Sequence, residues 1–204
     1  MKKGIGILAL LAVGFLVYWV VFKKKDSGQR DPKTEPIALK KHSEAFNNSV
    51  DKLVNAYLGI KDAFVTTDTA TAKSSTRNFI TLLDSLQLDE LKNDNAAVVE
   101  SARASVADIR ANAVSLLAQT DVKEMRQDFR MVTEMMYPAF FKTINYEGPK
   151  LYLQHCPMAF DDDQGADWIS NSTDIVNPYL GKNHPKYKGT MLHCGEVKDT
   201  IKAQ

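Results

Sequence analysis

Two short strings near the end of the 204-residue chain hold the residue types best suited to binding a metal. The strings are His155-Cys156-Pro157-Met158 and Met191-Leu192-His193-Cys194. Each supplies a thiol, a thioether and an imidazole within four residues, and soft sulfur ligands of this kind select Cu(I), or the similar Ag(I), over hard cations. The sequence therefore predicts that folding brings the two strings together around one soft metal ion.

The sulfur-bearing residues are the stronger candidate ligands. Pro157 restricts Cys156 to extended or turn geometry, so that Cys156 and Met158 can project to one side. Met191 and Cys194 can meet if the chain turns at Cys194-Gly195. His155 and His193 are supporting candidates only, because neighbours on a regular strand point to opposite faces.

Three other interpretations of the two cysteines remain open. A Cys156–Cys194 disulfide is allowed in an oxidising compartment and would make the segment purely structural. A zinc site of two cysteines and two histidines is also allowed, although zinc would leave the paired methionines unused. The third interpretation is two inert thiols.

Patterns typical of enzymes are missing from the sequence. It holds no glycine-rich phosphate loop, no Gly-x-Ser-x-Gly elbow and no Cys-x-x-Cys-His haem attachment string. The side-by-side residues His155 and Cys156 are also not the fold-assembled pair that activates a cysteine nucleophile. We therefore expect a binding protein and not an enzyme.

Upstream of the strings, apolar residues recur at helical spacing in four segments. Steps of three and four residues place each set on one helix face. The stripes run over residues 46–64, 72–86, 99–116 and 122–136. Caps are expected in the Thr66-Thr67-Asp68 cluster, at Asp94 or Asn95 and at Asp121, and Pro138 should disturb or end the last helix. Short connections predict an antiparallel four-helix bundle over residues 40–144.

The methionines and the histidine of this region are assigned to structure. Met125 and Met136 share the stripe of the fourth segment, which indicates core packing for the group that also includes Met131 and Met135. His42 precedes the first helix and is expected to be solvated. After Ile144 the helical spacing stops, so that residues 145–204 are predicted to form a loop-rich module with short strands, packed on the bundle.

The N-terminal segment has the properties of a membrane anchor. Residues 4–22 are uncharged and mostly apolar, and as a helix they would cross a bilayer core. Lys23-Lys24-Lys25 follow directly in place of a small-residue cleavage site, so residues 1–25 are interpreted as an uncleaved signal anchor. Residues 26–39 are interpreted as a tether.

The distribution of charged residues indicates which partners to expect and on which side of the membrane the domain lies. Five of the 26 basic residues flank the apolar stretch, so residues 26–204 hold 21 basic and 25 acidic residues. A net charge of −4 makes nucleic acid an unexpected partner. The seven basic residues between Lys23 and Lys41 outnumber Lys2 and Lys3, and this distribution alone favours a cytoplasmic domain.

Several strings resemble a bacterial family of uncharacterised domains. Members occur alone or fused to periplasmic adaptor subunits of copper and silver efflux systems. The resemblance covers most of residues 45–201 and rests on Ala56-Tyr57-Leu58, Lys61-Asp62-Ala63-Phe64, Cys156-Pro157-Met158-Ala159, Gly165-Ala166-Asp167-Trp168-Ile169, Asn177-Pro178-Tyr179-Leu180-Gly181 and Met191-Leu192-His193-Cys194-Gly195-Glu196-Val197. The sequence departs from the family pattern by inserting Lys182 to Lys188, which includes His184.

The resemblance implies a helical bundle with a metal-linked C-terminal module outside the cytoplasm. The positions that match the family strings are Cys156, Met158, Met191 and Cys194. Against the charge distribution, we therefore expect a single-pass protein of the inner membrane whose domain lies in the periplasm. The expected function is to bind Cu(I) or Ag(I) and to sequester it or hand it to metal-efflux or metal-delivery proteins.

Overall fold

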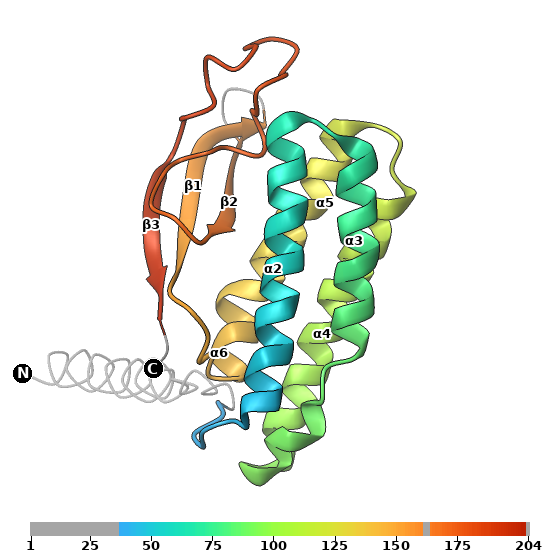
Figure 1. The fold of residues 1–204 in the computed structure, drawn as a ribbon, viewed down its shortest axis with the longest axis vertical. Coiled ribbons are helices and arrows are strands. Elements are labelled where there is room, and N and C mark those ends of the chain that lie inside the picture. Colours follow the sequence, from blue (N-terminus) through green and yellow to red (C-terminus); the bar gives the residue numbers. More distant parts are fainter. Residues whose placement is uncertain (1–36, 161–163, 203–204) are drawn as a thin grey trace, which may run out of the picture. The chain divides into compact units, whose positions relative to one another are not determined.

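Four long helices are the main secondary-structure elements of the described residues. The computed structural model describes residues 37–160 and 164–202. The helices are α2 (Glu44–Thr66), α3 (Thr69–Asp84), α4 (Ala96–Ala118) and α5 (Val122–Glu134). Helices that follow one another in the chain run side by side in opposite directions (Figure 1). The four apolar stripes of the sequence therefore correspond to four helices, as predicted.

Polar side chains fix where each helix begins. Asp68, Asn95 and Asp121 each accept hydrogen bonds from backbone amides of the first turn, at the positions expected from the sequence. Ser43 caps α2 in the same way, accepting from the Phe46 amide. Because these amides have no partner inside the helix, the caps set the register in which the apolar stripes face one another.

The last helix is interrupted near Pro138, as the sequence predicted. Helix α5 ends at Glu134, and a π-helical turn, Met135–Phe140, leads into the short helix α6 (Phe141–Thr143). Tyr137 lies outside helical geometry, and the Tyr137-Pro138 peptide bond is cis. A short 3-10 helix, Leu88–Asn93, connects α3 to α4.

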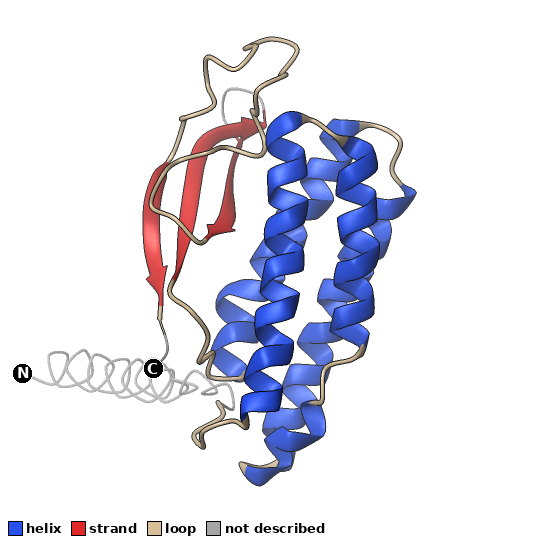
Figure 2. Cartoon of the chain, viewed as in Figure 1, coloured by secondary structure: helices blue, strands red, loops and turns tan. Residues whose placement is uncertain are grey.

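The C-terminal part forms a three-stranded sheet and one long loop. The strands are β1 (Leu151–Phe160), β2 (Gln164–Ser170) and β3 (Glu196–Ile201). Both neighbours pair antiparallel with β1, in the order β2-β1-β3. The loop between β2 and β3 carries the second sulfur string (Figure 2). The short extended pieces expected after Ile144 are thus one sheet.

The sheet and the helices share one core. The chain divides into Met1–Glu35 and Pro36–Gln204, and the second unit contains every helix and strand named above. Trp168 and Ile169 of β2 are fully buried, and the Ile169 amide donates to the Tyr57 hydroxyl on α2 at 3.1 Å. Met125 and Met136 are fully buried too, which confirms that they pack in the core.

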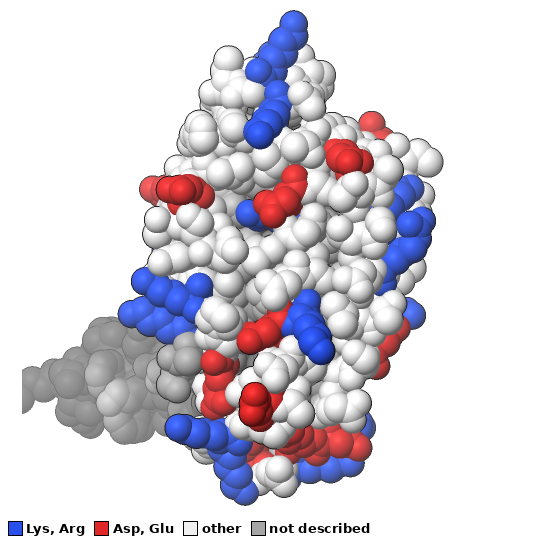
Figure 3. Space-filling view, viewed as in Figure 1, with Lys and Arg blue, Asp and Glu red and all other residues white. Residues whose placement is uncertain are grey.

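The surface carries charged side chains of both signs. On the face shown in Figure 3, basic and acidic side chains are interspersed, and lysines occupy the tip of the loop between β2 and β3. Lys182, Lys186 and Lys188 of this loop are exposed.

The anchor predicted over residues 4–22 lies outside the described residues, and none of the helices described here is long and apolar enough to cross a bilayer.

Candidate functional site

The two cysteines, 38 positions apart in the sequence, lie next to each other. The Cys156 Sγ and Cys194 Sγ atoms are 3.0 Å apart, and both residues are free cysteines. The separation exceeds the about 2.05 Å of a disulfide bond. The fold therefore places two thiols in direct contact.

Strand pairing explains how the second cysteine reaches the first. In the β1–β3 ladder His155 is opposite Glu196, so that Cys194, two positions before Glu196, arrives beside Cys156. Gly195 makes this approach with a positive φ of 141°. A Cβ atom there would lie only 2.6 Å from the His155 carbonyl oxygen, so that a side chain at this position would push the cysteine turn off the strand.

Asn177 holds the loop that carries Cys194. Its side-chain amide donates to the Cys194 carbonyl oxygen at 2.8 Å. Its Oδ1 atom accepts from the Tyr179 and Leu180 amides at 2.8 and 3.0 Å. The sequence predicts a turn at Asn177 but no role for it at the site; the available signal is an asparagine before proline, whose side chain commonly caps its own turn.

Burial differs between the two thiols. Cys156 is fully buried in β1, whereas Cys194 is partly exposed in the turn before β3. Burial first, and then the contact with Cys156, raise the pKa of the Cys194 thiol to about 12. At neutral pH Cys194 is therefore protonated, and a metal that binds it must displace the proton.

The two methionines lie near the cysteines in the sequence, one on β1 and one in the loop before β3. Met158 follows Cys156 on β1, at an irregularity of the β1–β2 ladder, and is half-buried against the core. Met191 is also half-buried, and its carbonyl oxygen accepts from the Cys194 amide at 3.0 Å. This bond closes a turn over Met191–Cys194, three residues before the turn expected at Cys194-Gly195. Within residues 37–160 and 164–202, no three His, Cys, Asp or Glu side chains cluster as a metal site.

The two neighbouring histidines are both held through Nδ1. His155 donates from Nδ1 to Asp167 Oδ1 at 2.6 Å, and Asp167 also pairs with Lys198 at 2.9 Å. His193 donates from Nδ1 to the Ile175 carbonyl oxygen at 2.7 Å. A neutral imidazole held in this way presents Nε2 as an acceptor, which is the arrangement found in histidines that bind metals. His155 is half-buried and His193 is exposed.

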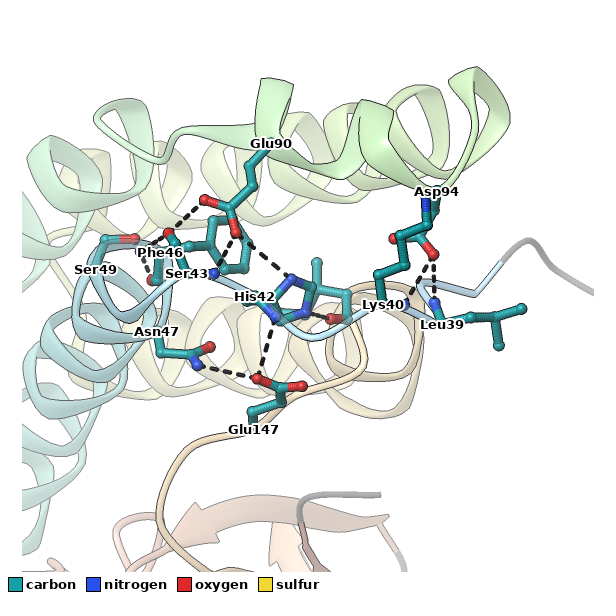
Figure 4. Close-up of polar contacts among 11 residues, drawn as sticks. Leu39, Lys40, His42, Ser43, Phe46, Asn47, Ser49, Glu90, Asp94 and Glu147 are labelled. Carbon is teal, nitrogen blue, oxygen red and sulfur yellow. Dashed lines mark hydrogen bonds and ion pairs between the residues drawn. The ribbon is translucent and has the colours of Figure 1, made fainter.

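His42 was expected to be solvated, and this expectation is wrong. Its side chain is only 3% exposed, and a ring nitrogen bonds the Ile144 carbonyl oxygen. Glu90 lies 4.0 Å from the other ring nitrogen, and the His42 amide donates to Glu147 at 3.3 Å (Figure 4). The ring is covered because the segment before α2 folds between the 3-10 helix and the chain that follows α6.

The same segment is fastened along its length. The Leu39 and Lys40 amides donate to Asp94 Oδ1 at 2.7 and 3.0 Å, and the Ser43 amide and hydroxyl donate to Glu90 (Figure 4). The Ala38 amide donates to the Thr143 carbonyl oxygen. These contacts give His42 a structural role at the base of the bundle.

Comparison with known proteins finds a family model that matches only the helical part of the chain. The model of a family described as a protein of unknown function (DUF3347) matches residues 53–146. The match runs from within α2 to the end of the helical region and stops before β1, so neither cysteine is inside it. No curated protein and no solved structure matches the chain.

Proposed function

We propose that the protein binds one Cu(I) or Ag(I) ion through Cys156 and Cys194 and passes it to other proteins. The observation that carries this proposal is the contact of the two sulfur atoms at 3.0 Å. Two thiolates on one ion form a soft-donor set, which favours a soft monovalent metal. The half-buried thioethers of Met158 and Met191, each within three positions of a cysteine in the sequence, are proposed as further donors of the same class.

Binding requires the two sulfur atoms to separate. Metal–sulfur bonds are about 2.3 Å long, so two of them in a line span about 4.6 Å. Cys194 is the partner that moves in this proposal, because it lies in a partly exposed turn while Cys156 is fixed within a buried strand. The partial exposure of Cys194 also gives an incoming thiol or thioether access to the ion, which suits transfer.

The two histidines act as supporting groups in this proposal. With Nδ1 bonded to Asp167 or to the Ile175 carbonyl oxygen, each presents Nε2 as a further acceptor. Each histidine directly precedes one of the two cysteines in the sequence. Replacing either by glutamine is expected to weaken binding less than loss of a cysteine, because sulfur is the preferred donor for Cu(I).

Anaerobic Cu(I) titration of the full chain, purified in detergent and reduced, tests the proposal. We expect uptake of one ion, in competition with a Cu(I) chelator of known affinity. The variants Cys194→Ala and Cys156→Ala should lose this uptake, and Met158→Leu and Met191→Leu should weaken it. Met131→Leu, which removes a thioether of α5 outside both strings, is the matched control. Undiminished stoichiometric uptake by the double cysteine variant would refute the proposal.

A second candidate function is structural, with the cysteines joined as a disulfide. The 3.0 Å contact between the sulfur atoms favours it, because only a small movement separates this arrangement from a bond. The protein would then be an interaction module of a membrane complex. Free-thiol counting on the protein isolated under nonreducing conditions, followed by metal titration after reduction, distinguishes the two. An oxidised protein that binds no Cu(I) when reduced would favour the structural function.

We also propose that the chain is anchored in the inner membrane through residues 4–22, with its domain in the periplasm and with metal-efflux or metal-delivery proteins as partners. The support is the apolar run with its flanking lysines and the resemblance to domains fused to efflux adaptors. A reporter that is active only in the cytoplasm, fused to Gln204, tests the orientation. Activity of that reporter would place the domain on the other side.

A further inference from the structure

A cavity lies between the start of α5 and two segments of the chain, one just after the first sulfur string (residues 159–160) and one before the second (residues 179–187). It encloses about 140 Å³, and none of the residues around it belongs to either string. Its walls are mostly apolar and aromatic, formed by Phe160, Tyr179, Leu180 and Tyr187 among others. Apolar cavities of about 150 Å³ are large enough to hold a benzene ring. The cavity therefore has room for a small organic molecule.

One wall of the cavity is a buried cation. Arg126 is 97% buried and donates from Nε to the Pro178 carbonyl oxygen at 2.9 Å. Its Nη2 donates to the Phe64 carbonyl oxygen at 2.9 Å and to the Thr67 hydroxyl at 3.2 Å. All three partners are uncharged, and none of the described carboxylates forms an ion pair with Arg126. A buried charge without a counter-ion is unfavourable, so this wall favours an anion.

The charged side chains that line the cavity, among the described residues, are basic. Burial lowers the pKa of Arg126 to about 10, which leaves it charged at neutral pH. Burial, and then the cations of Arg126 and Lys186, lower the pKa of His184. Most of the remaining lining side chains are apolar or aromatic.

We propose that this cavity binds a small organic carboxylate, with its carboxylate on Arg126 and its apolar or aromatic body against Phe160 and Tyr179. The guanidinium can receive it because Nη1 makes no hydrogen bond to the described residues and is the remaining donor of the group. The apolar walls favour an organic carboxylate over a fully hydrated inorganic anion. The site is independent of the metal proposal, since it shares no residue with the sulfur strings.

Isothermal titration of the full chain with three probes tests the site. Benzoate should bind, and benzamide, which has the same shape without the charge, should bind roughly tenfold or more weakly. Inorganic phosphate should not compete with benzoate. Equal binding of benzoate and benzamide, displacement by phosphate, or no benzoate binding would each overturn the proposal.

Three variants test whether benzoate binds in this cavity and distinguish loss of binding from loss of folding. Arg126→Gln removes the cation and should weaken benzoate binding roughly tenfold or more. Because Arg126 also holds Pro178, a second variant, Val122→Phe, fills the cavity from the first turn of α5 and keeps the arginine; it should abolish binding while the helical circular dichroism is retained. Arg103→Gln, at an exposed arginine of α4, is the control and should bind like the original chain.

The chain itself contains a competing anion. Asp161-Asp162-Asp163 follow Phe160 directly in the sequence. Benzoate binding by the original chain supports a site for an external carboxylate. Binding only by the triple variant D161N/D162N/D163N would show that these aspartates compete with benzoate for the site, and would overturn the proposal.

Discussion

The side-chain amide of Asn177 and the carbonyl oxygen of Cys194 are joined by a 2.8 Å hydrogen bond. The same asparagine accepts from the amides of Tyr179 and Leu180 and is itself fully buried. One side chain thus closes the turn that follows it and fixes the position of the second cysteine. The Asn-Pro-Tyr string and the cysteine string are thereby parts of one structure, although Asn177 and Cys194 are 17 positions apart in the chain.

Replacing Asn177 should loosen both the turn and the cysteine contact. Asn177→Ala leaves buried backbone groups without partners, and we expect the free energy of unfolding to fall by about 1–3 kcal/mol. Asn177→Asp keeps the acceptor but loses the donor to Cys194, so it should slow the diamide-induced formation of the Cys156–Cys194 disulfide. Denaturant unfolding followed by circular dichroism, and free-thiol counting over time, give the two measurements.

The control for the two Asn177 variants is Asn183→Ala. Asn183 also donates to a backbone oxygen, that of Thr66, but it is exposed. Its loss should change the free energy of unfolding by no more than about 0.5 kcal/mol. An Asn177→Ala protein as stable as the Asn183→Ala protein would contradict the role assigned to Asn177.

Much of the fold could be predicted because the helical signals are local. Apolar spacing and caps such as Asp68, Asn95 and Asp121 depend on residues within a few positions, so the sequence places these helices closely. The interruption at Pro138 is equally local. His42 was misjudged because its burial depends on residues 48 and more positions away, Glu90 and Ile144, which no local pattern reveals.

The cysteine site also combines features that the sequence reveals with features that only the structure reveals. The sequence nominated Cys156 and Cys194 by residue type, and strand pairing through β1 and β3 brings them into contact. The buried support of this site, Asn177, was not nominated, because its partners are backbone groups that the sequence does not display. Chemistry-bearing residues are visible by type, whereas the residues that position them become visible only in three dimensions.

A hydroxyl shared between the bundle and the sheet should contribute measurably to stability. Tyr57 on α2 is fully buried, and its hydroxyl contacts Thr133 of α5 at 2.6 Å and accepts from the Ile169 amide of β2. Tyr57→Phe leaves the buried Ile169 amide without this partner, while the Thr133 hydroxyl keeps its bond to the Phe129 carbonyl oxygen, so we expect a loss of about 1–3 kcal/mol in denaturant unfolding. Tyr152→Phe, at a half-buried position on β1, should stay within about 0.5 kcal/mol. Equal stabilities of the two variants would argue against this link between α2 and the sheet.

Cys194 should react slowly with alkylating agents. Its pKa is raised to about 12, so the nucleophilic thiolate is scarce at pH 7.5. Iodoacetamide should label it more than about a hundredfold more slowly in the folded protein than in urea, where the pKa returns to about 8.5. Mass spectrometry of the labelled Cys156→Ala chain should show faster reaction, because one cause of the raised pKa is removed. Rapid labelling of the folded original chain at pH 7.5 would contradict the raised pKa.

The affinity for Cu(I) should increase with pH. Between pH 6 and 8 the Cys194 group is a thiol, since its pKa of about 12 lies far above this range. Cu(I) binds the thiolate, so each ion taken up at Cys194 releases a proton, and the apparent Kd should fall about tenfold per pH unit for that proton. Chelator competition at pH 6, 7 and 8, corrected for protonation of the chelator, measures the slope. Cys194→Ala should lower the slope by about one unit in any residual binding, and a Kd that does not change with pH would show that the ion is not held by this thiol.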